Sequence, residues 1–299
     1  MINITDKSKC SGCHGCANIC PKKCISMEYD EEGFWYPKVN YDLCINCGLC
    51  EKVCPILNDL SIDNSPKAYA CFNRNENIRK ESSSGGVFTL LASYVIDCGG
   101  VVYGAAFSDD FQVKHISVTE KEKLYLLRGS KYVQSKLGNT YTEIKNLLNN
   151  GKMVYFSGTP CQIDGLLRYL NTSYDNLICQ DIVCHGVPIK QKDQFQQPAS
   201  QNEYMKVFLK DLCLRPSCYD CHSKGLKRNS DITLADFWGV REVCPEMYDN
   251  KGTSLVFINS KKGKELFEKI KPEIEYKEIN IHQAVQYNPS SYKSVEIPK

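Results

Sequence analysis

The pattern of hydrophobic and polar residues divides the chain into two parts. Residues 1–60 contain almost no long apolar runs, and a polar segment at 58–66 follows them. From residue 67 onward, short apolar runs typical of buried strands alternate with stretches of helical periodicity. We therefore expect a small unit at 1–60, followed by an α/β or α+β domain with a mixed sheet.

The same pattern predicts individual elements. Strands are expected at 67–72, 101–107, 113–118, 152–156, 177–183 and 254–259, and helices at 86–98, 119–127, 139–149, 162–170 and 263–270. The Gln-rich stretch 190–202 is expected to be a loop, and the tail beyond residue 270 is polar. The apolar run 85–107 is long enough for a membrane span, but Asp97 and the glycines that follow favour a helix, a turn and a buried strand.

Composition narrows the class of protein. The chain has 299 residues, of which 42% are hydrophobic, and this is enough for two domains with a sizeable core. The 37 basic and 35 acidic residues give a net charge of +2, which argues against a general nucleic-acid or membrane-surface binder. No export signal is visible at the N-terminus. We expect a cytoplasmic protein without a membrane span.

The 18 cysteines change this picture most. In a reducing cytoplasm, cysteines are more often metal ligands or redox groups than disulfides. Nine of them lie in the first 60 residues, and eight of these form two copies of C-x2-C-x2-C-x3-C-P, at 10–21 and 44–55. This spacing is the signature of bacterial ferredoxins with two [4Fe–4S] clusters. Residues 1–60 are called the ferredoxin unit below.

In this motif the fourth cysteine of each copy binds the other cluster. We therefore expect cluster one to be held by Cys10, Cys13, Cys16 and Cys54. Cluster two should be held by Cys20, Cys44, Cys47 and Cys50. Structural zinc is the alternative, but zinc does not require a doubled C-x3-C-P. Cys24 lies outside the pattern and is expected to be a small buried side chain.

A second group of cysteines lies in the following domain, and each member is expected at an element end or in a loop. The four residues, here called the second cysteine group, are Cys161, Cys184, Cys218 and Cys221. A third [4Fe–4S] cluster is the preferred interpretation. The alternatives are zinc, a redox-active Cys218/Cys221 pair, and a nucleophilic Cys161 at a helix N-terminus, with His185 as its base.

Small-residue loops offer a site for a phosphate-bearing cofactor. The Ser-Ser-Ser-Gly-Gly loop at 82–86 precedes a helix, and 128–132 adds a cation and an aromatic ring. Gly158, Thr159 and Pro160 follow a strand, at the end where α/β sheets bind ligands. Together these loops could cradle a flavin dinucleotide, although each alone is more often a plain cap or turn. The sequence contains neither GxGxxG nor a Walker A motif.

The order of these motifs resembles the family of coenzyme F-420 hydrogenase/dehydrogenase beta subunits. The segments are SSSGGVF (82–88), GSKYVQS (129–135), SGTPCQI (157–163), CHGVP (184–188), LRPSCYDC (214–221) and SDITLADFWG (230–239). The chain is also similar to formate dehydrogenase beta subunits and to plant 7-hydroxymethyl chlorophyll a reductase. The resemblance implies a small 2[4Fe–4S] ferredoxin domain at 1–60 and a mixed α/β flavin-binding domain, an α+β protein overall. The N-terminal part of the flavin domain is expected at 61–188 and a shortened C-terminal part at 189–299.

The resemblance also implies an FAD-containing iron–sulfur oxidoreductase. The residues it places around FAD, together with those of the strand-end loop, are Ser83, Ser84, Gly85, Gly86, Lys131, Tyr132, Gln134, Gly158, Thr159, Pro160 and Gln162. The second cysteine group would ligate the flavin-proximal cluster, with Asp236 and Trp238 nearby. Lys131 could stabilise reduced anionic flavin, and His185 or Tyr132 could donate a proton.

Two departures from the family bear on function. The stretch between the CHGVP and RPSC motifs is short, and the chain ends soon after residue 290. This fits a compact subgroup, a shortened chain or a copy that has lost substrate chemistry. The leading hypothesis is a flavin-dependent oxidoreductase acting on a small substrate of the coenzyme F-420 type or another, with a redox partner protein or ferredoxin-like donor. The alternatives are an electron-transfer subunit docked on a partner enzyme, and a zinc-binding interaction module at Cys218/Cys221.

Overall fold

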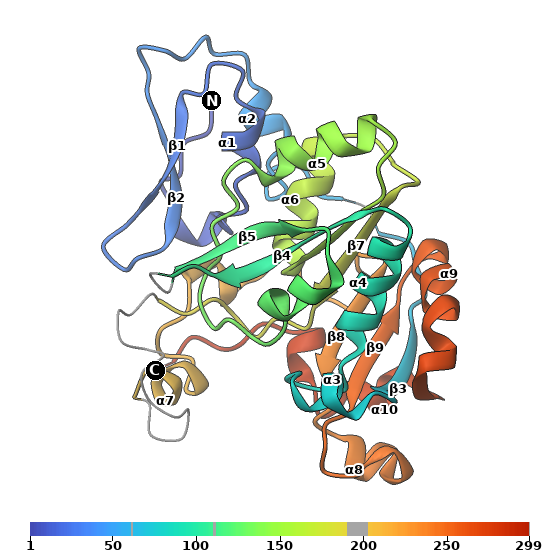
Figure 1. Cartoon of the computed structure of the whole chain (residues 1–299). Coiled ribbons are helices and arrows are strands. Elements are labelled where there is room, and N and C mark those ends of the chain that lie inside the picture. Colours follow the sequence, from blue (N-terminus) through green and yellow to red (C-terminus); the bar gives the residue numbers. More distant parts are fainter. Residues whose placement is uncertain (61, 110–111, 190–202, 299) are drawn as a thin grey trace.

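The computed structural model describes residues 1–60, 62–109, 112–189 and 203–298. The ferredoxin unit is a β-hairpin with two short helices packed beside it (Figure 1). Its elements are β1 (Ile25–Tyr29), β2 (Trp35–Val39), α1 (Gly15–Ile19), α2 (Leu49–Lys52) and the 3-10 turn η1 (Lys7–Lys9). Stacking of Tyr29 on Trp35, with ring centroids 3.7 Å apart, closes the hairpin.

The rest of the chain is built on an eight-stranded mixed sheet in the order β10-β3-β9-β8-β7-β6-β4-β5. Strands β4, β6, β7 and β8 are parallel, and the outer pairs are antiparallel. The strands are β3 (Lys67–Asn73), β4 (Val101–Phe107), β5 (Val113–Val118), β6 (Val154–Gly158), β7 (Leu177–Ile182), β8 (Ile232–Asp236), β9 (Ser254–Ile258) and β10 (Ile274–Ile279). Strands from both 61–188 and 189–299 therefore join one sheet.

Helices cover both faces of this sheet because its central strands are apolar on both sides. Val102 and Tyr155 pack with α4 and α9, whereas Val101 and Phe156 pack with α5 and α6 on the other face. The helices are α3 (Glu76–Lys80), α4 (Val87–Asp97), α5 (Thr140–Asn149), α6 (Pro160–Leu170), α7 (Glu203–Leu209), α8 (Val240–Val243), α9 (Lys261–Ile270) and α10 (Ile281–Val285). The short 3-10 segments are η2 (Lys121–Leu127), η3 (Pro216–Cys218), η4 (Pro245–Met247), η5 (Lys271–Glu273) and η6 (Pro289–Ser291).

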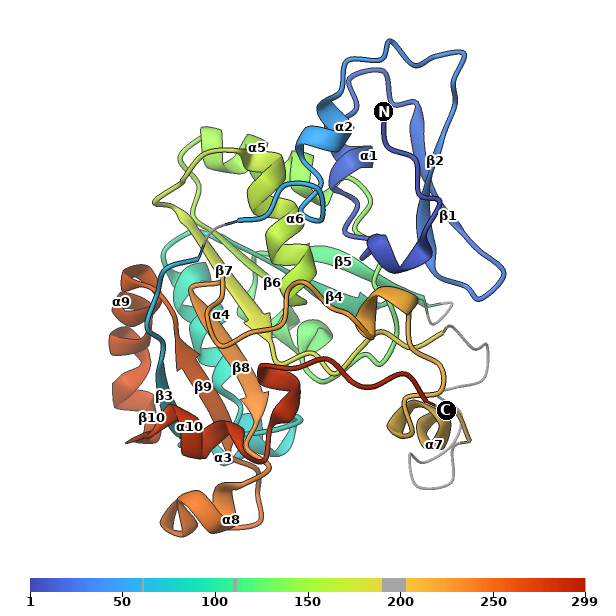
Figure 2. The same ribbon diagram turned by 180° about the vertical axis from the view of Figure 1, so that it is seen from behind.

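The ferredoxin unit rests on the face of the sheet covered by α5 and α6 (Figure 2). The two views agree that α4 and α9 lie on the opposite face. Because the central strands are parallel, their carboxyl ends share one edge, from which the loops after β6, β7 and β8 emerge.

Most of the predicted elements are confirmed. The expected strands and helices correspond to β3 to β7, β9, α4, α5, α6 and α9, but 119–127 forms a 3-10 helix. The hairpin β1–β2 and the elements α7, β8, β10 and α10 were not predicted. The predicted loop at 190–202 lies outside the described residues. In the described part of the chain, no helix is both long and apolar enough to cross a bilayer.

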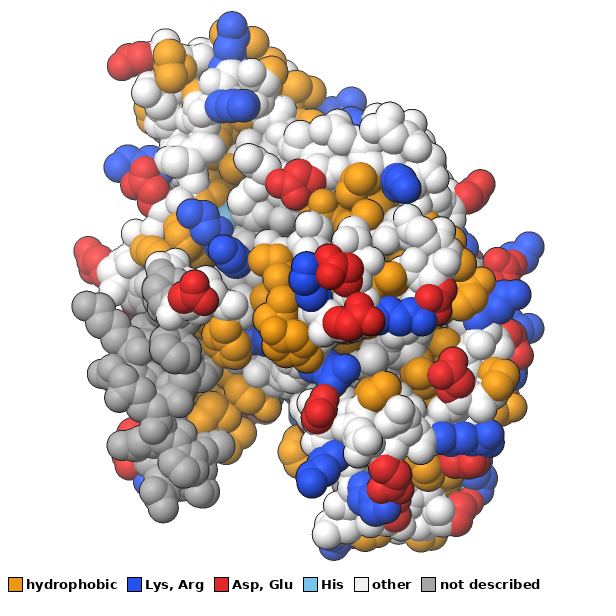
Figure 3. Space-filling view, in the orientation of Figure 1, with side chains coloured by type: hydrophobic (Ala, Val, Ile, Leu, Met, Phe, Trp, Pro, Cys, Tyr) orange, Lys and Arg blue, Asp and Glu red, His pale blue; other side chains and the backbone are white. Residues whose placement is uncertain are grey.

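The surface matches the near-neutral composition. Acidic and basic side chains are interspersed over the face shown in Figure 3.

Candidate metal centres and cofactor site

The structure brings together the four thiols expected for cluster one. Cys10 and Cys13 lie on the loop before α1, Cys16 is in the first turn of α1, and Cys54 follows α2. The loop curls through left-handed backbone at Gly12 and His14, with φ of +68° and 62°. Burial raises the pKa of Cys13 to about 12, and neighbouring Cys10 and Cys54 thiols contribute in the same direction.

The backbone around these thiols suits an anionic cluster. The N–H groups of Gly12, Gly15 and Ala17 donate hydrogen bonds to the sulfurs of Cys10, Cys13 and Cys16, respectively. Hydrogen bonds to sulfur stabilise the negative charge of an iron–sulfur cluster. The donor set is thiols with inward-pointing amides, and it therefore fits a [4Fe–4S] cluster.

The expected ligands of cluster two line one cavity in the ferredoxin unit. The cysteines that border it are Cys20, Cys24, Cys44, Cys47 and Cys50. Cys24 is buried, and its sulfur lies 3.3 Å from that of Cys20. The hydrogen bond with Cys20, assisted by burial, raises the pKa of Cys24 to about 11. The site thus holds a fifth thiol beside the four that the motif supplies.

The second cysteine group also converges, although its members come from three distant segments. Cys161 is in the first turn of α6, Cys184 follows β7, and Cys218 and Cys221 lie in and after η3. Each of the other three thiols raises the pKa of Cys161, after burial, which is the largest cause. The backbone N–H of Val187 lies 3.3 Å from the sulfur of Cys218.

The second cysteine group fits a cluster by its donor chemistry. Burial raises the pKa of Cys184 to about 11 and that of Cys218 to about 12, so bare thiols would be protonated at neutral pH. Iron would keep them as thiolates. In the described residues, no three His, Cys, Asp or Glu side chains are grouped for a single metal ion.

Helix α6 connects cluster one to the second cysteine group. Cys161 and Gly165 are four residues apart and so lie on one face of the helix. A Cβ atom placed on Gly165 would lie 2.8 Å from the Cβ and 3.0 Å from the sulfur of Cys13. Tyr141 packs at the same contact, and its hydroxyl donates a hydrogen bond to the Gln162 carbonyl at 2.7 Å. One helical turn therefore separates the two thiol groups.

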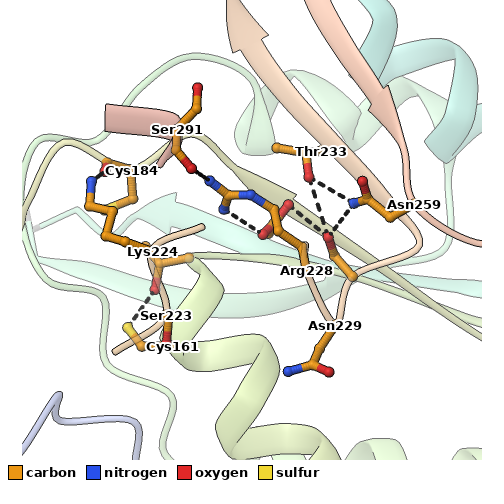
Figure 4. Close-up of polar contacts among 12 residues, drawn as sticks. Cys161, Cys184, Ser223, Lys224, Arg228, Asn229, Thr233, Asn259 and Ser291 are labelled. Atoms are coloured by element: carbon orange, nitrogen blue, oxygen red, sulfur yellow. Dashed lines mark hydrogen bonds and ion pairs between the residues drawn. The ribbon is translucent and has the colours of Figure 1, made fainter. Parts of the chain in front are cut away.

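A polar cavity borders the second cysteine group, and the sequence did not single out its residues Asp164, Ser223 and Asn229. Asp164, one turn beyond Cys161, accepts hydrogen bonds from Ser223 at 2.5 Å and Asn229 at 2.7 Å. Figure 4 shows Lys224 reaching toward Cys184, whose carbonyl it binds. The sequence offers one signal for this cavity. Charged residues stand within the apolar pattern of α6 and after the CxxC motif.

A buried ion pair anchors the same region. Arg228 donates to Asp181 at 3.0 Å, and both side chains are almost fully buried. Arg228 also donates to the carbonyl of Ser291 at 2.9 Å (Figure 4). The pair ties the loop after Cys221 to the end of β7.

The loop at 82–86 is held against the sheet. The Gly85 N–H donates to the Ser254 hydroxyl at 2.9 Å, and the Ser84 hydroxyl donates to the Thr253 carbonyl at 3.0 Å. A Cβ on Gly85 would lie 2.4 Å from the Cys71 carbonyl. Gly86 caps α4 at φ 74°. Part of the hydrogen-bonding capacity expected for flavin is therefore used within the protein, whereas the neighbouring Ser83 is exposed.

The loop after β6 forms a helix cap. The Thr159 N–H donates to the Gln162 side chain at 3.0 Å, and Pro160 occupies the first turn of α6. Gln162 in turn donates to Ser135 at 3.0 Å, and Ser135 contacts His115. Gly158 lies beside the same Gln162 side chain.

Gln134 lies at the boundary with the ferredoxin unit. Its side-chain oxygen accepts from the Trp35 N–H at 3.2 Å and from Arg215 at 3.3 Å, so it faces the ferredoxin unit.

The three expected catalytic side chains divide into two environments. Lys131 donates to the Arg128 carbonyl at 2.6 Å, and burial lowers its pKa to about 8. His185 lies 2.5 Å from Asp211 and 3.3 Å from the hydroxyl of Ser290. Tyr132 and His185 both pack on Phe208 of α7. The expected neighbours differ as well: Asp236 is half-buried near Ser84, and Trp238 is exposed.

These sites define an iron–sulfur protein: a dicluster ferredoxin unit on a mixed α/β domain. Family models agree. Residues 9–57 match the 4Fe-4S dicluster domain, 68–140 match the N-terminal model and 189–283 the C-terminal model of the coenzyme F420 hydrogenase/dehydrogenase beta subunit. The chain belongs to this family of coenzyme F420 hydrogenase/dehydrogenase beta subunits.

Individual relatives are distant. The coenzyme F420-dependent sulfite reductase of Methanocaldococcus jannaschii is 26% identical over 88% of this chain and 38% of its own length. One component of the F(420)H(2) dehydrogenase of Methanosarcina mazei is 19% identical over 93% of this chain and 87% of its own length. The chain spans about half or less of the first curated relatives it matches.

A solved structure shares the fold. The F420-reducing [NiFe] hydrogenase complex of Methanosarcina barkeri contains a chain that aligns with a TM-score of 0.53. The alignment is 18% identical and covers 70% of this chain and 81% of the other.

Proposed function

We propose that this protein moves single electrons between the ferredoxin unit and an FAD on the α/β domain, and that the flavin site exchanges electrons with a small substrate of the coenzyme F420 type. The observation that carries this proposal is the contact of Gly165 with Cys13, one helical turn from Cys161. It supports an order in which electrons pass from cluster two through cluster one to the second cysteine group.

The protein residues would perform the remaining work at the sites. FAD, when bound, supplies the conversion between one-electron and two-electron transfer. Lys131, with its pKa of about 8, could hold or release a proton near neutral pH. His185, positioned by Asp211, could donate a proton to a substrate held beside Tyr132. The thiols of the second cysteine group would ligate the cluster nearest the flavin.

A second function has an observation of its own. Ser84 and Gly85 already form hydrogen bonds to Thr253 and Ser254, which leaves fewer groups for a dinucleotide. This favours an electron-transfer subunit that delivers electrons to a partner enzyme and has no substrate site.

The deciding measurement is the content of iron, acid-labile sulfide and flavin after anaerobic reconstitution. About twelve irons and one FAD per chain are expected for three cubane clusters and a flavin. About twelve irons without flavin would select the electron-transfer subunit. About eight irons without flavin would contradict a cluster at the second cysteine group.

A further inference from the structure

Among the described residues, one buried arginine has no carboxylate partner. The arginines with almost no exposed surface in this part of the chain are Arg79, Arg215 and Arg228. Arg79 pairs with Asp249 at 2.6 Å and Arg228 with Asp181 at 3.0 Å. Arg215, which is only 1% exposed, forms no ion pair within the described ranges.

The contacts of Arg215 place it at the boundary between the ferredoxin unit and the α/β domain. Its Nε donates to the Cys10 carbonyl at 2.8 Å, and one terminal nitrogen donates to Gln134 at 3.3 Å. The guanidinium lies 4.1 Å from the centre of the Tyr36 ring. The other terminal nitrogen, Nη2, is buried and has no hydrogen-bond partner in the part of the chain that the structure describes.

A buried guanidinium without an ion-pair partner requires an anion nearby to balance its charge. Burying an unpaired charge is very costly, and buried charges in proteins are normally paired. Proximity identifies the anion: Arg215 Nε donates to the Cys10 carbonyl at 2.8 Å, and its guanidinium carbon would lie 3.2 Å from a Cβ placed on Gly12, within the loop that carries Cys10 and Cys13. Cys10 is an expected ligand of cluster one, whose thiolate-ligated core is anionic.

We propose that Arg215 is the counter-cation of cluster one and raises its reduction potential. This inference rests on the proposed assignment of cluster one to Cys10, Cys13, Cys16 and Cys54. Reduction adds one electron to the cluster and neither makes nor breaks a bond. The added negative charge is stabilised by a nearby cation, so Arg215 favours the reduced state. Net charge and hydrogen bonds to sulfur are established determinants of cluster potentials.

The same residue connects cluster one to the second cysteine group. The Arg215 carbonyl accepts a hydrogen bond from the Cys218 N–H at 2.8 Å, which closes the turn η3. One residue therefore contacts Cys10 with its side chain and positions Cys218 with its backbone. Because Arg215 stabilises the reduced form of cluster one, it favours an electron on the cluster that lies nearest the second cysteine group.

The test is an EPR-monitored redox titration of the reconstituted full-length protein, comparing wild type with Arg215→Met, Arg215→Lys and Gln134→Glu. In Arg215→Met, one cluster should become harder to reduce by about tenfold in equilibrium constant, equivalent to about 59 mV for one electron. Arg215→Lys should restore part of this shift because it retains the charge. Gln134→Glu should lower the same potential while keeping Arg215, because the new carboxylate would neutralise the guanidinium.

The matched control is Arg79→Met, which removes a buried arginine of α3 that stacks on Phe72 at 3.9 Å, away from the ferredoxin unit (Figure 1). It should change stability and leave every potential unchanged. If Arg215→Met does not bind iron, the cluster potentials of Arg215→Lys and Gln134→Glu provide the test. Potentials equal to wild type in the loaded variants would overturn the inference. If the wild-type protein binds fewer than about eight irons, the assignment of cluster one itself is refuted.

Discussion

Gly165 of α6 leaves the space that the side chain of Cys13 occupies. A Cβ on Gly165 would lie 2.8 Å from the Cys13 Cβ, closer than real contacts allow. On the other side of this contact, a Cβ on Gly15 would meet the Gly165 carbonyl at an ordinary 3.6 Å. The ferredoxin unit therefore packs so closely on α6 that a residue with a side chain does not fit at position 165 without displacing Cys13.

This relationship predicts different effects for two similar substitutions. Gly165→Ala should displace Cys13 and destabilise the protein by about 1–3 kcal/mol, the usual cost of overpacking. Gly15→Ala, at the same interface, should have a much smaller effect. Urea unfolding of the reconstituted variants measures both, and iron analysis shows whether cluster one is retained. Equal stability of the two variants would refute the close contact.

The second cysteine group can be tested by serine substitution. Cys161→Ser or Cys218→Ser should lower the iron content by about four per chain, because a cubane cluster needs its thiolate ligands. Cys213→Ser is the matched control, since Cys213 lies near the group in sequence but is not among the thiols that influence Cys161. Iron and sulfide analysis provides the measurement. Loss of about one metal ion instead of four would indicate zinc.

The buried ion pair of Arg228 and Asp181 at the polar cavity should contribute more to the free energy of unfolding than an exposed ion pair does. Arg228→Met leaves the Asp181 carboxylate buried and unpaired, so we expect a loss of about 3–5 kcal/mol. The comparison is Arg74→Met, which breaks a pair with Glu275 in which both side chains are about half exposed. That change should cost less than about 1 kcal/mol. Denaturant midpoints that fall equally in both variants would contradict this prediction.

Buried His115 should make stability depend on pH. Burial lowers its pKa from 6.5 to about 4, while its ring contacts the Ser157 carbonyl and the Ser135 hydroxyl at 3.0 Å. The unfolded chain then binds a proton that the folded protein excludes. This contribution is complete above pH 6.5 and is lost as the pH falls toward 4, by about 1.4 kcal/mol per pH unit.

The check compares wild type with His115→Gln by urea unfolding at pH 7 and pH 5. Acid damage to the clusters is common to both proteins and cancels in the difference. The wild type should lose about 2 kcal/mol more than the variant over this interval. Parallel losses would show that His115 does not carry the effect.

The sequence alone predicted the features that rest on local spacing. The doubled C-x2-C-x2-C-x3-C-P motif predicted the ferredoxin domain, and the strand-to-helix pattern predicted β4, β5 and α6. These succeed because a tight turn with three thiols, or a buried strand, depends on residues close together in the chain. Strand β10 was missed for a related reason. Four of the six β10 residues are exposed and three of these are charged, so the strand is not encoded in a hydrophobic run.

Only the tertiary structure decided which distant residues meet. Gly165 and Cys13, Arg215 and Cys10, and Arg228 and Asp181 are far apart in sequence, and nothing in their local patterns pairs them. Gln134 contacts Trp35 of the ferredoxin unit, which its local sequence does not indicate. Such contacts depend on how the ferredoxin unit packs on α6 and on which strands join the sheet. They are set by shape and buried charge across the whole molecule, so the sequence names the chemistry of the sites while the fold sets their order in space.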